Sequence, residues 1–325
     1  MSAPCRIAGL GAAVPVTVIP SATIDTRLGR EPGWTEARQG VRERRHADPA
    51  LGETAVSLGV AAATEALADA GVGAHEVDLL LNASGTPIQA IPDGAVLLQR
   101  ALGLGASGRP AYSVHATCLS FVVALDVASM WIASGRARTV LIVSTELASP
   151  GLNLDDPETA GLFGDGAAAA VITAPAPTGT LDAFRLETYG DQCELAQIPG
   201  GGSARSPMRG GTALDGAFQM NGPRLLRATL EHMPAFLDHV VPDRAVPDLV
   251  VPHQASRVGL EIAERSGFRP GVVARTLETL GNVVAASIPL TLHAAAREGR
   301  LRRGDRVLLV GTGAGLSLGA ALLTW

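Results

Sequence analysis

Residues 111–144, AYSVHATCLSFVVALDVASMWIASGRARTVLIVS, predict a strand, a tight turn, a helix and a second strand. The flanking runs 111–114 and 139–144 are short and apolar, which is typical of strands buried inside a sheet. Between them, apolar residues recur at helical spacing from Cys118 to Gly135. Because a crossover helix lets the two strands lie parallel, this stretch predicts an α/β fold with a parallel sheet.

The alternation of strands and helices continues on both sides of this stretch. Residues 34–45 interrupt it with a tryptophan and four arginines, and we expect there an irregular insert that is poor core material. The run 173–179 contains two prolines and reads as a connector between two related halves, 1–175 and 176–325. The expected strands are 6–10, 77–82, 167–172, 249–251, 306–310 and 316–323, and the expected helices are 53–71, 95–102, 224–239, 256–267 and one after Asn282.

Composition limits the classes of protein that this chain can belong to. Its 325 residues are 47% hydrophobic but only 3% aromatic, so a sizeable core must be built from Ala, Val, Leu and Ile. All 26 basic residues are arginine. The absence of lysine excludes Schiff-base chemistry on lysine, a pyridoxal-phosphate linkage and a Walker lysine, since each needs an ε-amine.

Charge and cysteine content indicate which partners and which cellular compartment to expect. The net charge is −5, and no basic cluster is dense enough to predict nucleic-acid binding. No apolar run approaches the roughly 18 residues of a membrane span. The three cysteines, at 5, 118 and 193, have no paired spacing, and the sequence shows no leader pattern at its start, so we expect a reduced, cytoplasmic protein.

Cys118 is the strongest candidate for a catalytic group. It follows a strand and opens a helix, where the helix dipole and a nearby imidazole would lower the pKa of its thiol. The plain alternative is a small buried hydrophobic residue, the commoner role of a lone cysteine. The small residues before it, Ala116 and Thr117, favour the catalytic interpretation.

Two later segments supply partners for a nucleophilic thiol. His253 follows a strand, so its ring should lie at the carboxyl edge of the sheet, where α/β folds place their ligands. The other six histidines are more simply explained as surface or structural residues, with His115 as the closest rival. Asn282 follows Gly281 in a turn, where it either caps the next helix or, together with His253, donates to a thioester carbonyl.

Two glycine-rich runs call for a structural interpretation. Residues 311–315, GTGAG, superficially match a dinucleotide-binding pattern, but only about ten residues follow, too few for the helix that this motif must open. We therefore expect a tight turn between two closing strands that brings backbone N–H groups near the thiol. Residues 200–202 precede no helix and read as a surface loop.

Taken together, these segments resemble β-ketoacyl-acyl carrier protein synthase III of the thiolase-like condensing enzymes, over essentially the whole chain. The resemblance rests on joint occurrence rather than on any one motif. The matching pieces are 34–45, the Cys118 helix, 162–166 with Phe163, 220–222, 252–255, 281–282 with the following Ala-Ser-Ile-Pro, and 313–315.

The resemblance implies a thiolase-like five-layered αβαβα fold of two pseudo-symmetric halves, acting as a homodimer on acyl-coenzyme A or acyl carrier protein, with no metal or redox cofactor. Cys118 would take an acyl group from a thioester, with the N–H groups of Cys118 and Ala314 as oxyanion hole. A malonyl thioester would then lose CO₂ against His253 and Asn282, and the carbanion would attack the acyl group.

The resemblance also implies substrate-binding residues. Trp34 would stack on adenine, Arg38 would hold phosphates, Gly222 would lie along the pantetheine arm, and Ile91 would reach into the acyl pocket of the partner subunit. We also count Phe163 and Ser256 among the substrate-binding residues.

The sequence departs from the family pattern at several of these positions. An aromatic residue is common where Ile91 stands, Pro157 falls near the place of the usual second adenine-stacking arginine, and Ser256 replaces an asparagine. These departures point to a different acyl group and to a carrier protein as donor. The loop 200–207 is more similar to secondary-metabolism members than to housekeeping fatty-acid members.

Three other functions compete with condensation. An acyltransferase on the same fold would move the acyl group from Cys118 to an alcohol or amine without losing CO₂. A silent subunit would bind a condensing partner, but it would be free to lose Cys118, His253 and Asn282. A dinucleotide-dependent oxidoreductase would need the glycine motif in another place.

Overall fold

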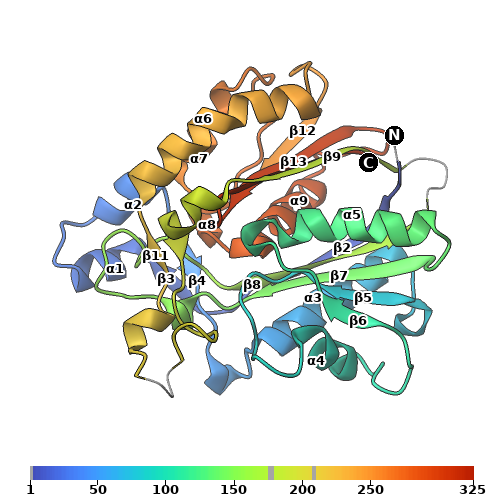
Figure 1. Cartoon of the computed structure of the whole chain (residues 1–325), viewed down its shortest axis with the longest axis horizontal. Helices are drawn as coiled ribbons and strands as arrows, with labels where there is room; N and C mark the ends of the chain where they lie inside the picture. The colour runs from blue at the N-terminus through green and yellow to red at the C-terminus, as the bar shows by residue number, and fades with distance from the viewer. Residues whose placement is uncertain (1–2, 175–178, 207–209) are drawn as a thin grey trace.

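The structure of the chain, a computed structural model, describes residues 3–174, 179–206 and 210–325. Its centre is two five-stranded sheets, each with helices on both faces (Figure 1). The first sheet has the order β2 (Arg6–Ala13), β8 (Gly166–Thr173), β7 (Thr139–Glu146), β5 (Leu79–Asn82) and β6 (Ala111–Ser113). The second has the order β1 (Ala3–Pro4), β9 (Thr180–Thr188), β14 (Ser317–Thr324), β13 (Arg306–Gly313) and β12 (Leu249–Pro252).

The two sheets repeat the same pattern of strand pairing. In the series β2, β8, β7, β5 and in the series β9, β14, β13, β12, the first two pairings are antiparallel and the third is parallel. The repetition agrees with the two related halves expected from the sequence. The sheets are mixed, however, and not parallel as predicted, because β13 and β14 follow one another through a short turn that only antiparallel strands can use.

Two helices, α5 (Ser120–Ala133) and α9 (Ser287–Arg297), form the layer between the sheets. Their buried side chains, among them Phe121 and Leu292, share one core with Leu81 of the first sheet and Val251 of the second. Most residues of α5 are buried or partly buried, and its first three residues are inaccessible to solvent. Both helices begin at the same end of the molecule as the candidate catalytic segments.

The outer layers complete a five-layered αβαβα arrangement. Helices α3 (Ala55–Ala70) and α4 (Gly94–Ala101) cover the first sheet, and α6 (Gly222–Val240) covers the second, with α7 (Arg257–Arg265) beside it (Figure 1). The contact of α3 with β2 requires glycine, since a Cβ at Gly11 would lie 2.1 Å from the carbonyl oxygen of Ala62. Small residues thus replace aromatic bulk in this core, as the composition predicted.

Several sequence expectations differ from the structure. The segment 34–45 is not irregular: it contains α2 (Trp34–Gln39) and β4 (Glu43–Arg45), which pairs with β3 (Val18–Pro20). Nor is it poor core material, because Arg44 is fully buried. Its guanidinium donates to the carbonyl oxygens of Ile19 and Gly161 and to the hydroxyl of Ser21, and these three partners explain its burial.

Strand β9 lies between β1 and β14 and was not predicted, because its polar and apolar residues are mixed and show no clear strand pattern. The predicted connector 173–179 and the loop 200–207 lie partly outside the described residues.

The remaining elements are short. They are helix α8 (Leu277–Leu280), helix α1 (Ser21–Arg27) and strand β11 (Gln219–Met220), which pairs with β10 (Ala196–Gln197). In the part of the chain that the structure describes, no helix combines the length and the apolar character that crossing a bilayer requires.

Candidate active site

Cys118 lies in a single 3-10 turn, Thr117–Leu119, between β6 and α5. The helix proper begins at Ser120, so Cys118 precedes it instead of opening it as predicted. Thr117 has a φ of 51°, a conformation that costs a β-branched residue about 1–3 kcal/mol. The strained turn places Cys118, a residue of intermediate exposure, at the start of the central helix.

His253 follows β12 directly, and the structure brings it to the turn that holds Cys118. The two segments meet at Gly311 of β13, where an added Cβ would lie 2.6 Å from Cβ of His253 and 3.4 Å from a methyl group of Leu119. No side chain fits at position 311, so glycine is required for this approach. The expected placement of His253 at the carboxyl edge of the strand is therefore what the structure shows.

Asn282 is held by backbone hydrogen bonds on both sides. Its N–H donates to the carbonyl of Leu162 (2.8 Å), and its own carbonyl accepts from the N–H of Gly164 (3.1 Å). The side-chain Oδ1 accepts from the N–H of Val284 (2.9 Å). This contact fixes the orientation of the amide, and its nitrogen, which is the donor of the side chain, is left to donate to a ligand.

The Asn282 turn also reaches the nucleophile segment. Gly85 lies between them, since a Cβ there would fall 2.7 Å from a methyl group of Val284 and 3.2 Å from the carbonyl oxygen of Thr117. Val284 has a φ of 43°. Among the described residues, Thr117 and Val284 are the two non-glycine residues with positive φ, and both lie within two residues of a predicted catalytic side chain.

The turn between β13 and β14 supplies donors to the thiol, as the sequence predicted. The backbone N–H groups of Ala314 and of Cys118 itself lie near the sulfur and act to lower the pKa of the thiol. Thr117 Oγ1 lies 3.4 Å from the carbonyl oxygen of Ala314 and ties the two turns together. The geometry suits an oxyanion hole made by these two N–H groups.

The acidity of Cys118 differs from the sequence expectation. Burial raises the pKa of the thiol to about 12, and the charge of Glu146 acts in the same direction, against the opposing effect of the two N–H donors. The lowered pKa that the sequence predicts from the helix dipole is therefore wrong. The helix dipole is outweighed by the desolvation of a thiol enclosed by two sheets and by the carboxylate at the end of β7.

Glu146 is a functional candidate that the sequence analysis missed. It ends β7, is fully buried, and its two oxygens accept hydrogen bonds from the N–H of Gly85 (2.6 Å) and from the N–H and hydroxyl of Thr86 (2.8 and 2.7 Å). The N–H of Ala285 donates to it as well. It thus joins the loop after β5 to the turn that carries Asn282, beneath Cys118. Its position at a strand end was the available signal.

Glu146 should also make stability depend on pH. Burial raises its pKa from 4.5 to about 7, so the folded protein binds this proton more tightly than the unfolded chain does. Its contribution to the free energy of unfolding therefore falls as pH rises from about 4.5 to about 7, by roughly 3 kcal/mol.

We expect Glu146→Gln to remove this pH-dependent part, although the variant is less stable overall because its amide would face three N–H donors. Urea unfolding of both proteins between pH 4.5 and 8 measures the difference. Equal pH slopes for wild type and variant would contradict the assignment.

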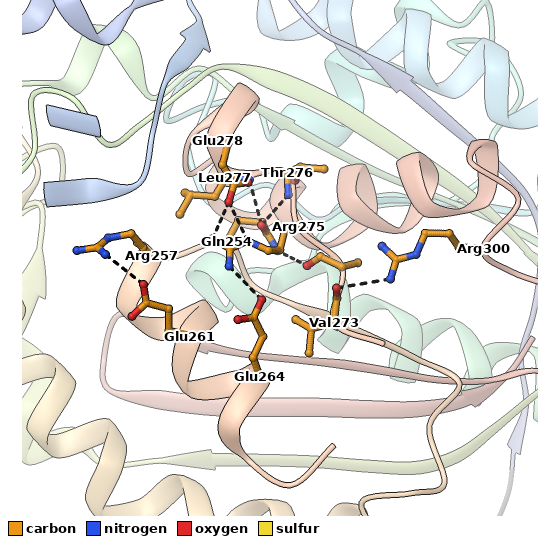
Figure 2. A network of polar contacts seen from close by, with 11 residues as sticks. Gln254, Arg257, Glu261, Glu264, Val273, Arg275, Thr276, Leu277, Glu278 and Arg300 are labelled. Atoms are coloured by element: carbon orange, nitrogen blue, oxygen red, sulfur yellow. Dashed lines mark hydrogen bonds and ion pairs between the residues drawn. The ribbon is translucent and has the colours of Figure 1, made fainter. Parts of the chain in front are cut away.

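The backbone beside His253 is fixed by Gln254 (Figure 2). Its side chain is fully buried, donates to two carbonyl groups, and accepts from the N–H groups of Thr276 (2.9 Å) and Leu277 (3.1 Å). Figure 2 shows this cluster together with Arg275, which pairs with Glu264 and Glu278 at the surface. With every amide hydrogen-bonding position used, Gln254 holds the start of α8 relative to β12.

Desolvation lowers the pKa of the His253 imidazole to about 4, so the ring is neutral near pH 7. Its Nδ1 lies 2.5 Å from the hydroxyl oxygen of Ser287, the first residue of α9. A neutral ring carries one N–H donor, which is what a carbonyl or enolate oxygen requires.

A cavity of about 440 Å³ leads from the surface to His253. It runs between α6 and α7, and its walls are mainly apolar. At its outer end Arg38 pairs with Glu158 (2.8 Å). The lining includes Arg38, Glu158, Gly222, Ser256, His253 and Gly311.

Only some of the predicted substrate-binding residues line this cavity. Arg38, Gly222 and Ser256 line the cavity, and Trp34 lies beside Arg38, whose guanidinium is 5.5 Å from its ring centre. Ile91 is 87% exposed in the loop after β5. Phe163 lies outside the cavity lining: its ring is buried edge-on against Phe218, and the neighbouring Leu162 lines the cavity instead.

The other histidines have structural partners or lie at the surface. His115, the closest rival, is exposed, with Nδ1 3.3 Å from the carbonyl oxygen of Ser84. His46 contacts the carbonyl oxygen of Phe163, and His232 stacks on Tyr189. Of the seven, His253 is the one that lines the cavity.

Comparison with known proteins agrees with this geometry. The family model for 3-oxoacyl-[acyl-carrier-protein] synthase III matches residues 112–190, and the model for its C-terminal part matches residues 245–325. A β-ketoacyl-[acyl-carrier-protein] synthase III of Rhodospirillum centenum is 37% identical, with 98% of each chain covered. The chain belongs to the β-ketoacyl-[acyl-carrier-protein] synthase III family.

Solved structures of synthase III proteins share the fold. The enzyme of Aquifex aeolicus superimposes with a TM-score of 0.89 at 31% identity, covering 99% of this chain and 100% of that one. The priming β-ketosynthase of the R1128 polyketide pathway gives 0.86 at 27% identity, covering 99% and 96%. The prediction of a thiolase-like five-layered fold is thereby confirmed, and this synthase III chain is a condensing-type acyltransferase by family.

Proposed function

We propose that the protein joins an acyl thioester to a malonyl thioester with loss of CO₂. In the loading step, the sulfur of Cys118 attacks the acyl carbonyl carbon, and the bond from that carbon to the sulfur of the donor breaks. The thiol proton leaves with the donor, which departs as a free thiol. The N–H groups of Cys118 and Ala314 stabilise the transient oxyanion.

In the condensing step, the bond between the malonyl α-carbon and its carboxylate breaks and CO₂ departs. The electron pair remains as an enolate, whose oxygen accepts hydrogen bonds from His253 and Asn282. The enolate carbon then attacks the acyl carbonyl on Cys118, and the carbon–sulfur bond breaks. The thiolate takes a proton from solvent, and a β-ketoacyl thioester leaves.

One observation carries this proposal: the segments that carry two sets of hydrogen-bond donors meet at the turn that holds the thiol. The first set is the pair of backbone N–H groups at the sulfur. The second is a neutral imidazole and an amide whose oxygen is already occupied. Transfer of an acyl group to an alcohol or amine would use the first set and a base, and would leave the role of Asn282 unexplained.

Mass spectrometry of the intact protein tests the proposal. We would incubate the enzyme with a panel of acyl-coenzyme A and acyl carrier protein thioesters, map any adduct, and then add malonyl thioester and measure CO₂. An adduct on Cys118 followed by CO₂ release supports condensation. An adduct without CO₂ favours the simple acyltransferase, and no adduct from any donor favours a silent subunit.

The source of the acyl group is a further part of the proposal. Arg38 and Trp34 support a coenzyme A donor, because a cation and an aromatic ring lie at the outer end of the cavity. The pairing of Arg38 with Glu158 opposes it, since the carboxylate competes with a phosphate. An acyl carrier protein is therefore the second donor to test. The polyketide assignment of the R1128 relative supports secondary metabolism beside fatty-acid synthesis.

The Arg38–Glu158 pair gives a quantitative prediction. We expect Glu158→Gln to lower the KM for an acyl-coenzyme A donor about two- to fivefold, because Arg38 is freed to bind phosphate at a partly exposed site. Arg38→Ala is the matched control and should raise the same KM. Stopped-flow or mass-spectrometric loading rates measure both, and an increase in KM for Glu158→Gln would be the contrary result.

The proposal also covers the oligomeric state, the cofactor requirement and the cellular location of the protein. We place a second copy of the chain against the loop that carries Ile91, whose exposure supports a contact there. The chemistry above needs neither a metal nor a redox cofactor. A thiol nucleophile must stay reduced, which supports a cytoplasmic location.

A further inference from the structure

The hydroxyl of Ser287 contacts the imidazole of His253. Oγ of Ser287 lies 2.5 Å from Nδ1, and the two residues are only 2% and 6% exposed. Ser287 is the first residue of α9 and lies five residues after Asn282, so one segment carries both the amide and this hydroxyl. The contact is buried and short, and it joins α9 to the end of β12.

The direction of this hydrogen bond follows from the other partner of the hydroxyl. The backbone N–H of Gln254 points at the same oxygen, at 3.4 Å, and an N–H can only donate. Within the described residues, these two are the hydrogen-bond partners of Ser287 Oγ. Oγ has a second lone pair, but of these two partners Nδ1 is the one that can accept, so donation to Nδ1 is the arrangement that leaves the buried O–H hydrogen paired.

We propose that Ser287 is a positioning residue that donates its hydroxyl hydrogen to Nδ1 of His253 and thereby keeps the ring proton on Nε2. A neutral imidazole has one protonated and one unprotonated nitrogen, and a donor at Nδ1 selects the tautomer that is protonated at Nε2. No protein partner for Nε2 occurs among the described residues, and the ring lines the cavity.

This assignment deepens the proposed function and rests on it. With its proton on Nε2, His253 donates to an enolate oxygen but cannot accept the proton of the Cys118 thiol. Ser287 would therefore serve the condensing step and leave the loading step to the two backbone donors at the sulfur. Asn282 is fixed in the same way, because the N–H of Val284 holds its Oδ1 and leaves the amide nitrogen to donate.

The two partial reactions separate this role from a structural one. We expect Ser287→Ala to slow CO₂ release from malonyl thioester about ten- to a hundredfold, as for other hydrogen-bonded partners that fix a histidine tautomer. Acylation of Cys118 should change by no more than about twofold. Ser287→Thr retains a hydroxyl and should restore most of the decarboxylation rate.

Thr291→Val is the matched control. Thr291 lies one turn further along α9, is equally buried, and donates its hydroxyl to the carbonyl of Ser287 (2.8 Å). Its loss removes a buried hydroxyl from the same helix without touching His253. We expect this variant to lose stability while keeping the wild-type ratio of decarboxylation to acylation.

The tautomer itself can be read by NMR on ¹⁵N-histidine-labelled protein, with the His253 signals identified by their loss in His253→Gln. We expect Nε2 to carry the proton in the wild type and a mixture of tautomers in Ser287→Ala. A proton on Nδ1 in the wild type would overturn the inference, as would an equal loss of acylation and decarboxylation in Ser287→Ala.

If instead the wild type takes no acyl group and releases no CO₂, the proposed function fails. The NMR experiment still decides the tautomer in that case, because it needs no substrate.

Discussion

Cys118→Ala is expected to abolish the acyl-enzyme and to lower the overall rate of condensation by at least about a thousandfold. The sulfur is the atom that carries the acyl group between the two half-reactions, and no neighbouring side chain can replace it. Mass spectrometry after incubation with the best acyl donor measures the adduct, and release of CO₂ measures the second step. The fold should persist, because the mutation removes only the sulfur atom of a small side chain.

The chain provides its own control for this experiment. Cys193 is an exposed free cysteine and Cys5 is a buried one, and burial raises the pKa of the Cys5 thiol to about 12. Cys193→Ala should keep both the adduct and the condensation rate. If the adduct survives in Cys118→Ala and vanishes in Cys193→Ala, the nucleophile has been assigned to the wrong residue.

The fold was largely predictable because its strands are short apolar runs with helical segments between them. The predicted strands 77–82 and 139–144 agree with β5 and β7 to within two residues at each end. What failed depended on partners distant in the chain. Arg44 reads as a surface arginine until the carbonyl oxygens of Ile19 and Gly161 surround it. Strand direction failed for a local reason, because the short turn between β13 and β14 makes this pair antiparallel.

The catalytic residues were predictable to different degrees. Cys118, His253 and Asn282 each follow a strand or a turn, and the structure brings their segments together at Gly85 and Gly311. Their chemistry was less predictable, since the raised pKa of Cys118 comes from its burial and from Glu146. Glu146 and Ser287 were harder to recognise, because a glutamate at a strand end is a weak signal and a serine before an Ile-Pro pair has many ordinary explanations.

Asn282→Ala is the second variant for which we expect a large effect. Loss of one of two donors to a developing oxyanion should slow decarboxylation about a hundredfold to a thousandfold. Loading of Cys118 should remain near the wild-type rate, because its oxyanion hole uses the N–H groups of Cys118 and Ala314. Rates of adduct formation and of CO₂ release, measured separately, test this division.

Asn282→Asp isolates the donor from its structural contact. The aspartate retains an oxygen for the N–H of Val284, and the backbone hydrogen bonds to Leu162 and Gly164 are unaffected by the side chain. It replaces only the amide nitrogen, the group proposed to face the enolate, by a second acceptor. Decarboxylation should therefore be lost in Asn282→Asp as fully as in Asn282→Ala, while thermal stability stays closer to wild type. Recovery of decarboxylation in Asn282→Asp would mean that Asn282 acts through the turn it stabilises, and that His253 alone donates to the enolate.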